Sequence, residues 1–312
     1  MGAARRRRRA HWGRWWASVP VDALTVVGSA PGHGTSLSLN DVEYVDARVF
    51  EPSDLRRREF EAATPFPHLV VDDVLKDEAR SLLDVFPSED WDGWHRYGDE
   101  YQRNKLICSD IDRIPAPFDQ LIRELNDPTF LARLEQLTGI ANLIPDPYLE
   151  GGGLHCSGPG GVLAPHTDFH VYTRLNLYRR INVLVYLNPE WDHADGGQLE
   201  LFAVGADSPS ERIEPTWGRM VVFLTDDRSP HGFTTPVAPG KFRRSVALYY
   251  YTSTETEGFS GDTNTYWKQH GDQRGVRRWR LVLYKLLLTA SRAFSFLAHR
   301  VNPNLGSRVR PK

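Results

Sequence analysis

A histidine followed two residues later by an aspartate occurs three times in the chain, and this spacing suits a metal site. The pairs are His166 and Asp168, His193 and Asp195, and His270 and Asp272. Residues i and i+2 of a strand project to the same side, so each pair could offer an imidazole and a carboxylate to one metal ion. The motif alone is weak, and its surroundings must distinguish the three copies.

The surroundings favour the first pair. The second pair lies in the polar connection Asn188–Gly197, where a tight turn between strands explains it. The third pair follows the last core strand that we expect, so we predict a surface loop there. The first pair follows the glycine-containing loop Gly160–Pro165 and precedes a set of strands, which places it at the mouth of a barrel.

A third ligand is available in His231, directly after the apolar segment Met220–Leu224. A histidine at the end of that strand would project toward the same mouth. Two histidines and one carboxylate on one face of Fe(II) leave three positions open, enough for a bidentate 2-oxo acid and O2. We therefore predict a non-haem Fe(II) site formed by His166, Asp168 and His231.

Arg243 follows His231 by twelve residues (243 − 231) and begins a strand-like segment. With the period of two of a strand, Arg243 and Ser245 share one face and Arg244 lies on the other. A guanidinium beside a hydroxyl suits a buried carboxylate, which accepts bidentate charge-assisted hydrogen bonds. For Arg243 alone, an exposed strand edge is the alternative, and Arg244 is the alternative partner if the register shifts by one residue.

Short strands separated by Gly, Pro, Asn and Asp predict a β-sandwich or barrel from about residue 143 to 252. The clearest strands are Ile181–Leu187, Gln198–Phe202, Met220–Leu224 and Ser245–Tyr251, after an earlier strand at His68–Val71. Helices are expected from Ala79 to Phe86, from Phe118 to Leu125, and from a cap at Asp127-Pro128 to Gly139.

These patterns divide the chain into three parts. Residues 1–60 mix arginine-rich, Gly/Ser-rich and acidic pieces and are interpreted as a flexible or loosely packed leader. Residues 61–255 form the predicted catalytic domain. Residues 256–312 form an extension whose spacing after Gly275 predicts a basic amphipathic helix, which could pack on the domain, form a homo-oligomer, or lie on a membrane surface.

Composition excludes several classes of protein. The net charge of −2 over 312 residues provides no electrostatic footprint for nucleic acid. Two cysteines are too few for a disulfide scaffold, which favours a reducing, cytoplasmic setting. Asp22 interrupts the apolar stretch behind Arg5–Arg9, so a signal peptide is not predicted, and no apolar run reaches the roughly 18 residues of a membrane span.

Five motifs then carry a family resemblance over residues 65–255. They are His166-Thr-Asp168, Val185–Trp191, Gly196–Leu201, Pro230-His231 and Arg243–Tyr249. In order and spacing, the chain resembles the prolyl-4-hydroxylase-like dioxygenases that depend on 2-oxoglutarate and Fe(II). The resemblance implies a mainly β fold, a double-stranded β-helix or jelly roll, with helices supporting its major sheet.

The resemblance also implies roles for individual residues. His166, Asp168 and His231 match the iron ligands, and Arg243 matches the residue that pairs with the C5 carboxylate of 2-oxoglutarate. Tyr186 matches a tyrosine that hydrogen-bonds the same carboxylate. Where relatives often have a tyrosine facing the co-substrate, this chain has Cys156.

The implied reaction is hydroxylation of an unactivated C–H bond of a small molecule, amino acid or peptidyl residue. It would use Fe(II), 2-oxoglutarate and O2, with ascorbate as an additional candidate, and would release succinate and CO2. The alternatives are a jelly-roll binding module without iron and a cupin-like metalloenzyme without 2-oxoglutarate. Candidates for the substrate side, whose charge would favour an acidic substrate, are His155, His170, Arg174, Arg179 and Arg180.

Overall fold

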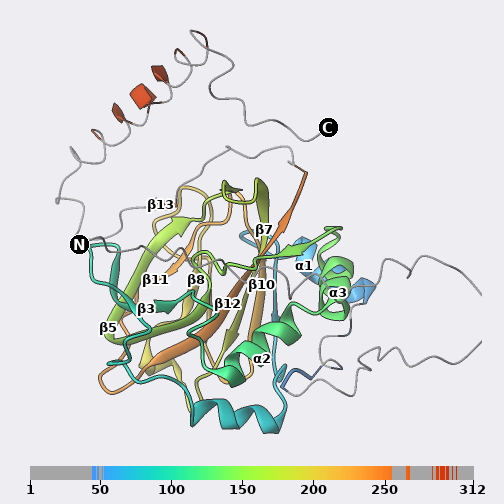
Figure 1. Ribbon diagram of the computed structural model, residues 1–312, viewed down its shortest axis with the longest axis vertical. Helices are drawn as coiled ribbons and strands as arrows, with labels where there is room; N and C mark the ends of the chain where they lie inside the picture. Colours follow the sequence, from blue (N-terminus) through green and yellow to red (C-terminus); the bar gives the residue numbers. More distant parts are fainter. Residues whose placement is uncertain are drawn as a thin grey trace, which may run out of the picture. The chain divides into compact units, whose positions relative to one another are not determined.

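The protein is built around one antiparallel sheet that curls on itself (Figure 1). The computed structural model describes residues 44–46, 48, 51, 53–254 and 265–267, with positions 283, 286, 287, 289–291, 293, 294, 297 and 300. Every strand pairing in this part of the chain is antiparallel, and helices pack on one face of the sheet. The predicted jelly roll with supporting helices is confirmed.

The helical elements are α1 (Asp54–Ala62), η1 (Asp77–Leu83), α2 (Ala116–Leu125), α3 (Pro128–Thr138) and η2 (His193–Asp195). The strands up to the middle of the chain are β1 (His68–Val71), β2 (His95–Tyr97), β3 (Gln102–Cys108), β4 (Ile144–Pro145), β5 (Gly153–Thr167), β6 (Val171–Tyr172) and β7 (Leu177–Tyr186). The later strands are β8 (Leu199–Leu201), β9 (Glu211–Ile213), β10 (Met220–Leu224), β11 (His231–Phe233), β12 (Arg243–Thr252) and β13 (Tyr266–Trp267).

Strand β5 connects the two layers of the curled sheet. The main path runs β1-β10-β7-β12-β5-β11-β8-β9. The first half of β5 pairs with β12 on one side and with β3 on the other, whereas its second half pairs with β11. Residues from both halves of β5 can therefore face the same interior.

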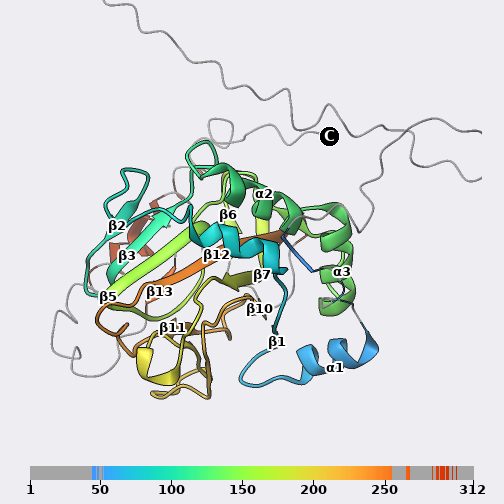
Figure 2. The same ribbon diagram turned by 90° about the horizontal axis from the view of Figure 1, so that it is seen from below.

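The largest apolar cluster lies between the sheet and helices α2 and α3. Figure 2 shows both helices on one side of β12 and β7, with β11 on the other. Alternate residues of the strands face the helices, among them Val183 on β7 and Leu248 on β12, both almost fully buried. The opposite faces of β7 and β12 are thereby left to line the interior of the roll.

Helix α3 begins and ends where the sequence predicts. The Asp127 carboxylate accepts a hydrogen bond from the Thr129 amide, and Gly139 ends the helix in a left-handed conformation. The helix predicted from Ala79 to Phe86 is present as the 3₁₀ helix η1, which ends at Leu83 and not at Phe86. Its buried residues Ala79 and Leu82 are three apart, which is the period of a 3₁₀ helix.

Two pieces of the segment assigned to the leader pack on the domain. Phe60 of α1 is buried in the main core. The Glu124 carboxylate of α2 accepts hydrogen bonds from the amides of Tyr44 and Val45, at 3.0 and 2.9 Å to Oε2. A buried acceptor on the domain thus fixes the chain eighty residues earlier.

The C-terminal extension is described only in part. Positions between 283 and 300 that the structure describes are helical, and their large apolar side chains, such as Leu286 and Phe294, are exposed. Strand β13 pairs with the end of β5, opposite Thr167 and His166. Among the described residues, no helix is long and apolar enough to cross a membrane.

A glycine substitution tests the close pairing of β5 with the end of β3. Gly153 has a φ of +92°, and a Cβ there would overlap the carbonyl oxygen of Cys108. Gly205 has a φ of +84° but nothing within 4 Å of an added Cβ. Backbone strain should lower the free energy of unfolding of both alanine variants by roughly 1–2 kcal/mol. The overlap with the Cys108 carbonyl should lower that of Gly153→Ala by roughly 1–3 kcal/mol more. Equal decreases in the unfolding free energy of the two variants, measured by chemical denaturation, would contradict the close contact between Gly153 and Cys108.

Candidate metal and co-substrate site

Three buried side chains converge at the mouth of the roll. His166 lies near the end of β5, Asp168 directly follows that strand, and His231 begins β11 opposite His166. One ligand atom from each lies within 4.8 Å of the others. In the part of the chain that the structure describes, this is the group of side chains that could hold a metal ion.

The two histidines are oriented for metal binding by their backbones. The Nδ1 atom of His166 lies 2.9 Å from the carbonyl oxygen of Ala164, and that of His231 lies 3.0 Å from the carbonyl oxygen of Ser229. A neutral imidazole that donates from Nδ1 leaves a lone pair on Nε2. Both Nε2 atoms face Asp168, at 3.7 and 3.6 Å from its oxygens.

Burial sets the charges of this group. It lowers the pKa of His166 to about 3, with His231 adding to the effect, and it also lowers the pKa of His231. Burial alone would raise the pKa of Asp168, but Arg179 and the two histidines hold it well below its usual range. At neutral pH the site therefore offers two neutral imidazoles and one carboxylate, which is the donor set that Fe(II) binds in two-histidine, one-carboxylate sites.

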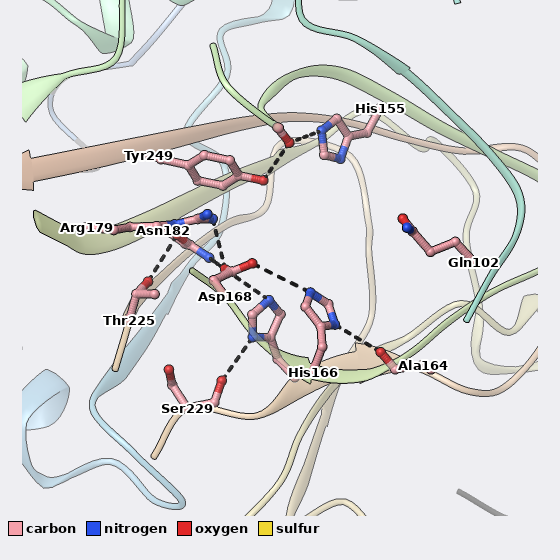
Figure 3. Close-up of polar contacts among 12 residues, drawn as sticks. Gln102, His155, Ala164, His166, Asp168, Arg179, Asn182, Thr225, Ser229 and Tyr249 are labelled. Carbon is pink, nitrogen blue, oxygen red and sulfur yellow. Dashed lines mark hydrogen bonds and ion pairs between the residues drawn. The ribbon is translucent and has the colours of Figure 1, made fainter. Parts of the chain in front are cut away.

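A second layer of buried groups holds the carboxylate (Figure 3). Asp168 Oδ2 accepts a hydrogen bond from Asn182 Nδ2 at 2.8 Å and lies 2.8 Å from Arg179 Nη2. Asn182 is fixed in turn, since its Oδ1 accepts from Arg179 Nε and from Thr225 Oγ1. Arg179 also lies over the ring of Tyr249, with its Cζ 3.4 Å from the centroid.

The second His-x-Asp pair forms a turn, as predicted. His193 is exposed and pairs with Glu214, whereas the Asp195 carboxylate accepts from the amide of Asp192 and forms an ion pair with Lys241 at 2.9 Å. The two residues thus have structural partners within η2 and its neighbours. The third pair, at 270 and 272, lies outside the described residues.

Arg243 lies on the inner face of β12, and Arg244 lies on the outer face. Arg243 Nε donates to the carbonyl of Gly197 at 2.6 Å, and Nη2 donates to the Tyr186 hydroxyl at 3.0 Å. Its guanidinium also lies over the Phe233 ring, 4.5 Å from the centroid. Within the described part of the chain, Nη1 makes no hydrogen bond. Arg244 lies over Phe86, on the helix side.

Ser245 shares the inner face with Arg243. It pairs in register with Tyr186 of β7 on one side and with His155 of β5 on the other. Opposite residues of neighbouring antiparallel strands point to the same face. Tyr186, Ser245 and His155 therefore form one row across three strands, adjacent to Arg243.

Cys156 faces away from this interior and packs in the main core, so His155 and Ser157 are the neighbouring residues that face inward. The other substrate-side candidates already have partners. Arg179 holds Asp168, His170 pairs with Asp227 at 3.1 Å, and Arg174 lies over the ring of Tyr148. Arg180 donates to Thr252.

Lys105 of β3 was not identified from the sequence. This buried lysine interacts electrostatically with both Asp168 and Arg243. The available signal was the apolar run Leu106–Cys108 directly behind it, which predicts a buried strand.

Comparisons with known proteins agree with this geometry. Residues 152–251 match the family model of the 2OG-Fe(II) oxygenase superfamily. Two curated relatives are prolyl 3-hydroxylase OGFOD1 of Xenopus laevis, 32% identical over 77 residues, and prolyl 3,4-dihydroxylase OGFOD1 of Ostreococcus tauri, 35% identical over 83 residues. The aligned segments cover 23% and 24% of this chain, but only 15% and 16% of those relatives.

Among solved structures, a prolyl-4-hydroxylase of Pseudomonas putida superposes with a TM-score of 0.47 at 20% identity. The match covers 64% of this chain and 99% of that one.

The family-model match spans β5 to β12 and includes the His-Asp-His group and Arg243. This stretch of the chain therefore matches the 2OG-Fe(II) oxygenase superfamily, whose members use Fe(II), 2-oxoglutarate and O2. The family predicted from the five motifs is confirmed. The structure also fits these cofactors, because it presents a donor set for Fe(II) and an arginine with a free nitrogen for a carboxylate.

The interior row predicts a pH dependence of stability. Burial lowers the pKa of His155 to about 3 from a usual 6.5, with Lys105 adding to the effect. Because the unfolded chain binds this proton first, the stabilisation present above pH 6.5 is lost as the pH falls toward 3. Between pH 6.5 and 4.5, the free energy of unfolding of the wild type should fall by up to about 2.7 kcal/mol more than that of His155→Gln.

Denaturant unfolding of both proteins at several pH values measures this difference. His95 is exposed, so His95→Gln serves as the control and should leave the pH profile unchanged. A constant difference between wild type and His155→Gln would contradict the burial of a neutral His155.

Proposed function

We propose that this protein is a dioxygenase that hydroxylates an unactivated C–H bond of a small molecule, amino acid or peptidyl residue. Iron would be held by His166, Asp168 and His231. Arg243, with Tyr186 and Ser245 beside it, would bind the C5 carboxylate of 2-oxoglutarate. The supporting observation is that the His-Asp-His group and a partly free arginine face one interior, joined by strand β5.

When bound, Fe(II) couples the oxidative decarboxylation of 2-oxoglutarate by O2 to the hydroxylation, giving succinate and CO2. The chain's own residues position and shield these reactants. Arg179 and Asn182 hold Oδ2 of Asp168 so that Oδ1 faces His166. Arg243 offers Nη1 to the far carboxylate and is itself fixed by Gly197 and Tyr186, which limits the entropy lost on binding.

A prolyl residue in a peptide is the first substrate to test. The two curated relatives are named prolyl hydroxylases, although this chain spans less than a fifth of their length. Short proline-containing peptides and free amino acids therefore form the initial screen, with succinate formation as the readout.

Substitutions at two His-x-Asp pairs test the iron site. His166→Ala and Asp168→Ala should weaken Ni(II) binding at least about 100-fold, since loss of even a hydrogen-bonding partner of a ligand costs 10- to 100-fold. Both variants should also abolish succinate formation with Fe(II). Isothermal titration and a succinate assay provide the two measurements.

His193→Ala is the matched control, because His193 belongs to an equivalent motif but pairs with Glu214 on the surface. It should bind Ni(II) and form succinate as the wild type does. If His193→Ala lost metal and His166→Ala retained it, the assignment of the iron site would be wrong.

Arg243→Ala should raise the Kd for 2-oxoglutarate by about 100-fold or more in the Ni(II)-loaded protein. An unpaired buried carboxylate costs several kcal/mol, and about 2.7 kcal/mol corresponds to 100-fold. Arg244→Ala is the control, since Arg244 lies on the helix side of β12. A defect in Arg244→Ala with normal affinity in Arg243→Ala would refute the proposed carboxylate partner.

A further inference from the structure

Lys105 lies in one row with Ser157 and Arg243. It pairs with Ser157 of β5, which pairs in turn with Arg243 of β12. Directly opposite residues share a face, so Lys105 and Arg243 point into the same interior from strands on either side of β5. With neighbouring strands about 4.8 Å apart, the two backbones are roughly 10 Å apart.

The ammonium group of Lys105 is near the His-Asp-His group. Lys105 Nζ donates to Gln102 Oε1 at 3.3 Å. Figure 3 shows the Gln102 side chain extending toward the space between His155 and His166. In agreement, Lys105 interacts electrostatically with His155 and His166. The lysine thus reaches the interior between the metal ligands and Arg243.

Lys105 is buried without an anionic partner. Its exposed fraction is 9%, and among the described residues it forms no ion pair. The nearby Asp99 accepts hydrogen bonds from the amides of Tyr101 and Gln102. Burial lowers the pKa of Lys105 to about 8, opposed by Asp168 and assisted by Arg243. A buried ammonium group with one weak hydrogen bond destabilises the fold unless a ligand supplies further hydrogen-bond or charge partners.

The charges around Lys105 favour the binding of an anion. Lys105 interacts in this interior with two cations, Arg179 and Arg243, and with two carboxylates, the exposed Asp99 and the buried Asp168. Oδ2 of Asp168 is already engaged by Arg179 and Asn182. The excess is positive before any metal ion is added, and a carboxylate at Lys105 would reduce it.

We propose that Lys105 is a second carboxylate-binding residue of this pocket, distinct from Arg243. The carboxylate is either the C1 carboxylate of 2-oxoglutarate or one carried by the substrate. The inference rests on the proposed function for the identity of the pocket. It assigns an anionic group to the side of the interior that β3 lines, across β5 from Arg243.

Three variants test this proposal: Lys105→Met removes the charge at similar length, Lys105→Arg keeps it, and Arg103→Met removes an exposed cation of the same strand. In metal-free protein, Lys105→Met should raise the melting temperature, because it removes an unpaired buried charge. A lower melting temperature would show that Lys105 has a structural partner and would overturn the proposal. This readout needs no bound ligand.

Binding measurements distinguish the two carboxylates. If the partner is C1 of 2-oxoglutarate, Lys105→Met should weaken 2-oxoglutarate binding to the Ni(II)-loaded protein at least 10-fold. Lys105→Arg should retain most of the affinity, and Arg103→Met should retain all of it. If the partner belongs to the substrate, 2-oxoglutarate affinity should not change, but acetate should stabilise wild type and not Lys105→Met, relative to chloride at equal ionic strength.

The stabilisation by acetate is measured with and without Ni(II) and 2-oxoglutarate. Should wild type fail to bind 2-oxoglutarate, the proposed function fails, while acetate on the metal-free protein still tests Lys105. If neither ligand distinguishes Lys105→Met from wild type, Lys105 binds no carboxylate and the proposal is wrong.

Discussion

The interior of this protein depends on the stabilisation of one buried carboxylate. Asp168 is only 7% exposed, and a carboxylate removed from water is stable only when charges and donors replace its hydration. Arg179 and Asn182 supply that replacement from β7, and the histidines face it from β5 and β11. Strands far apart in sequence must therefore meet at one point, which the curled sheet achieves.

Beside the Arg179–Asp168 pair, the interior holds two further buried cations, Lys105 and Arg243. The main-core side of the same strands is apolar, so the alternation along β5, β7 and β12 separates a hydrophobic layer from a charged one. The change of side between adjacent residues is clear at Arg243 and Arg244. Arg243 lies over Phe233 in the interior, whereas Arg244 lies over Phe86 on the helix side. A change of register by one residue would exchange these environments.

The period of two of a strand predicts that Arg243 and Ser245 share one face, and this is correct because β12 pairs with β5 in unbroken register from Arg243 to Ala247. The choice among the three His-x-Asp motifs was also within reach, since it required only the order of strands downstream. Lys105 was not predictable, because its position depends on β3 pairing with β5 across a register irregularity. The role of Arg179 is not predictable for a related reason. The sequence does not show that this arginine forms an ion pair with the buried Asp168.

Strand β13 limits how a partner can approach the metal ligands. Around His166, one side of β5 pairs with β11 and the other with β13. An extended peptide can bind a protein by adding to an open strand edge, where its backbone completes the ladder. Among the described residues, His166 lies on a strand whose two edges are already taken by this chain. A peptide ligand must therefore be recognised there through its side chains, or take the place of β13.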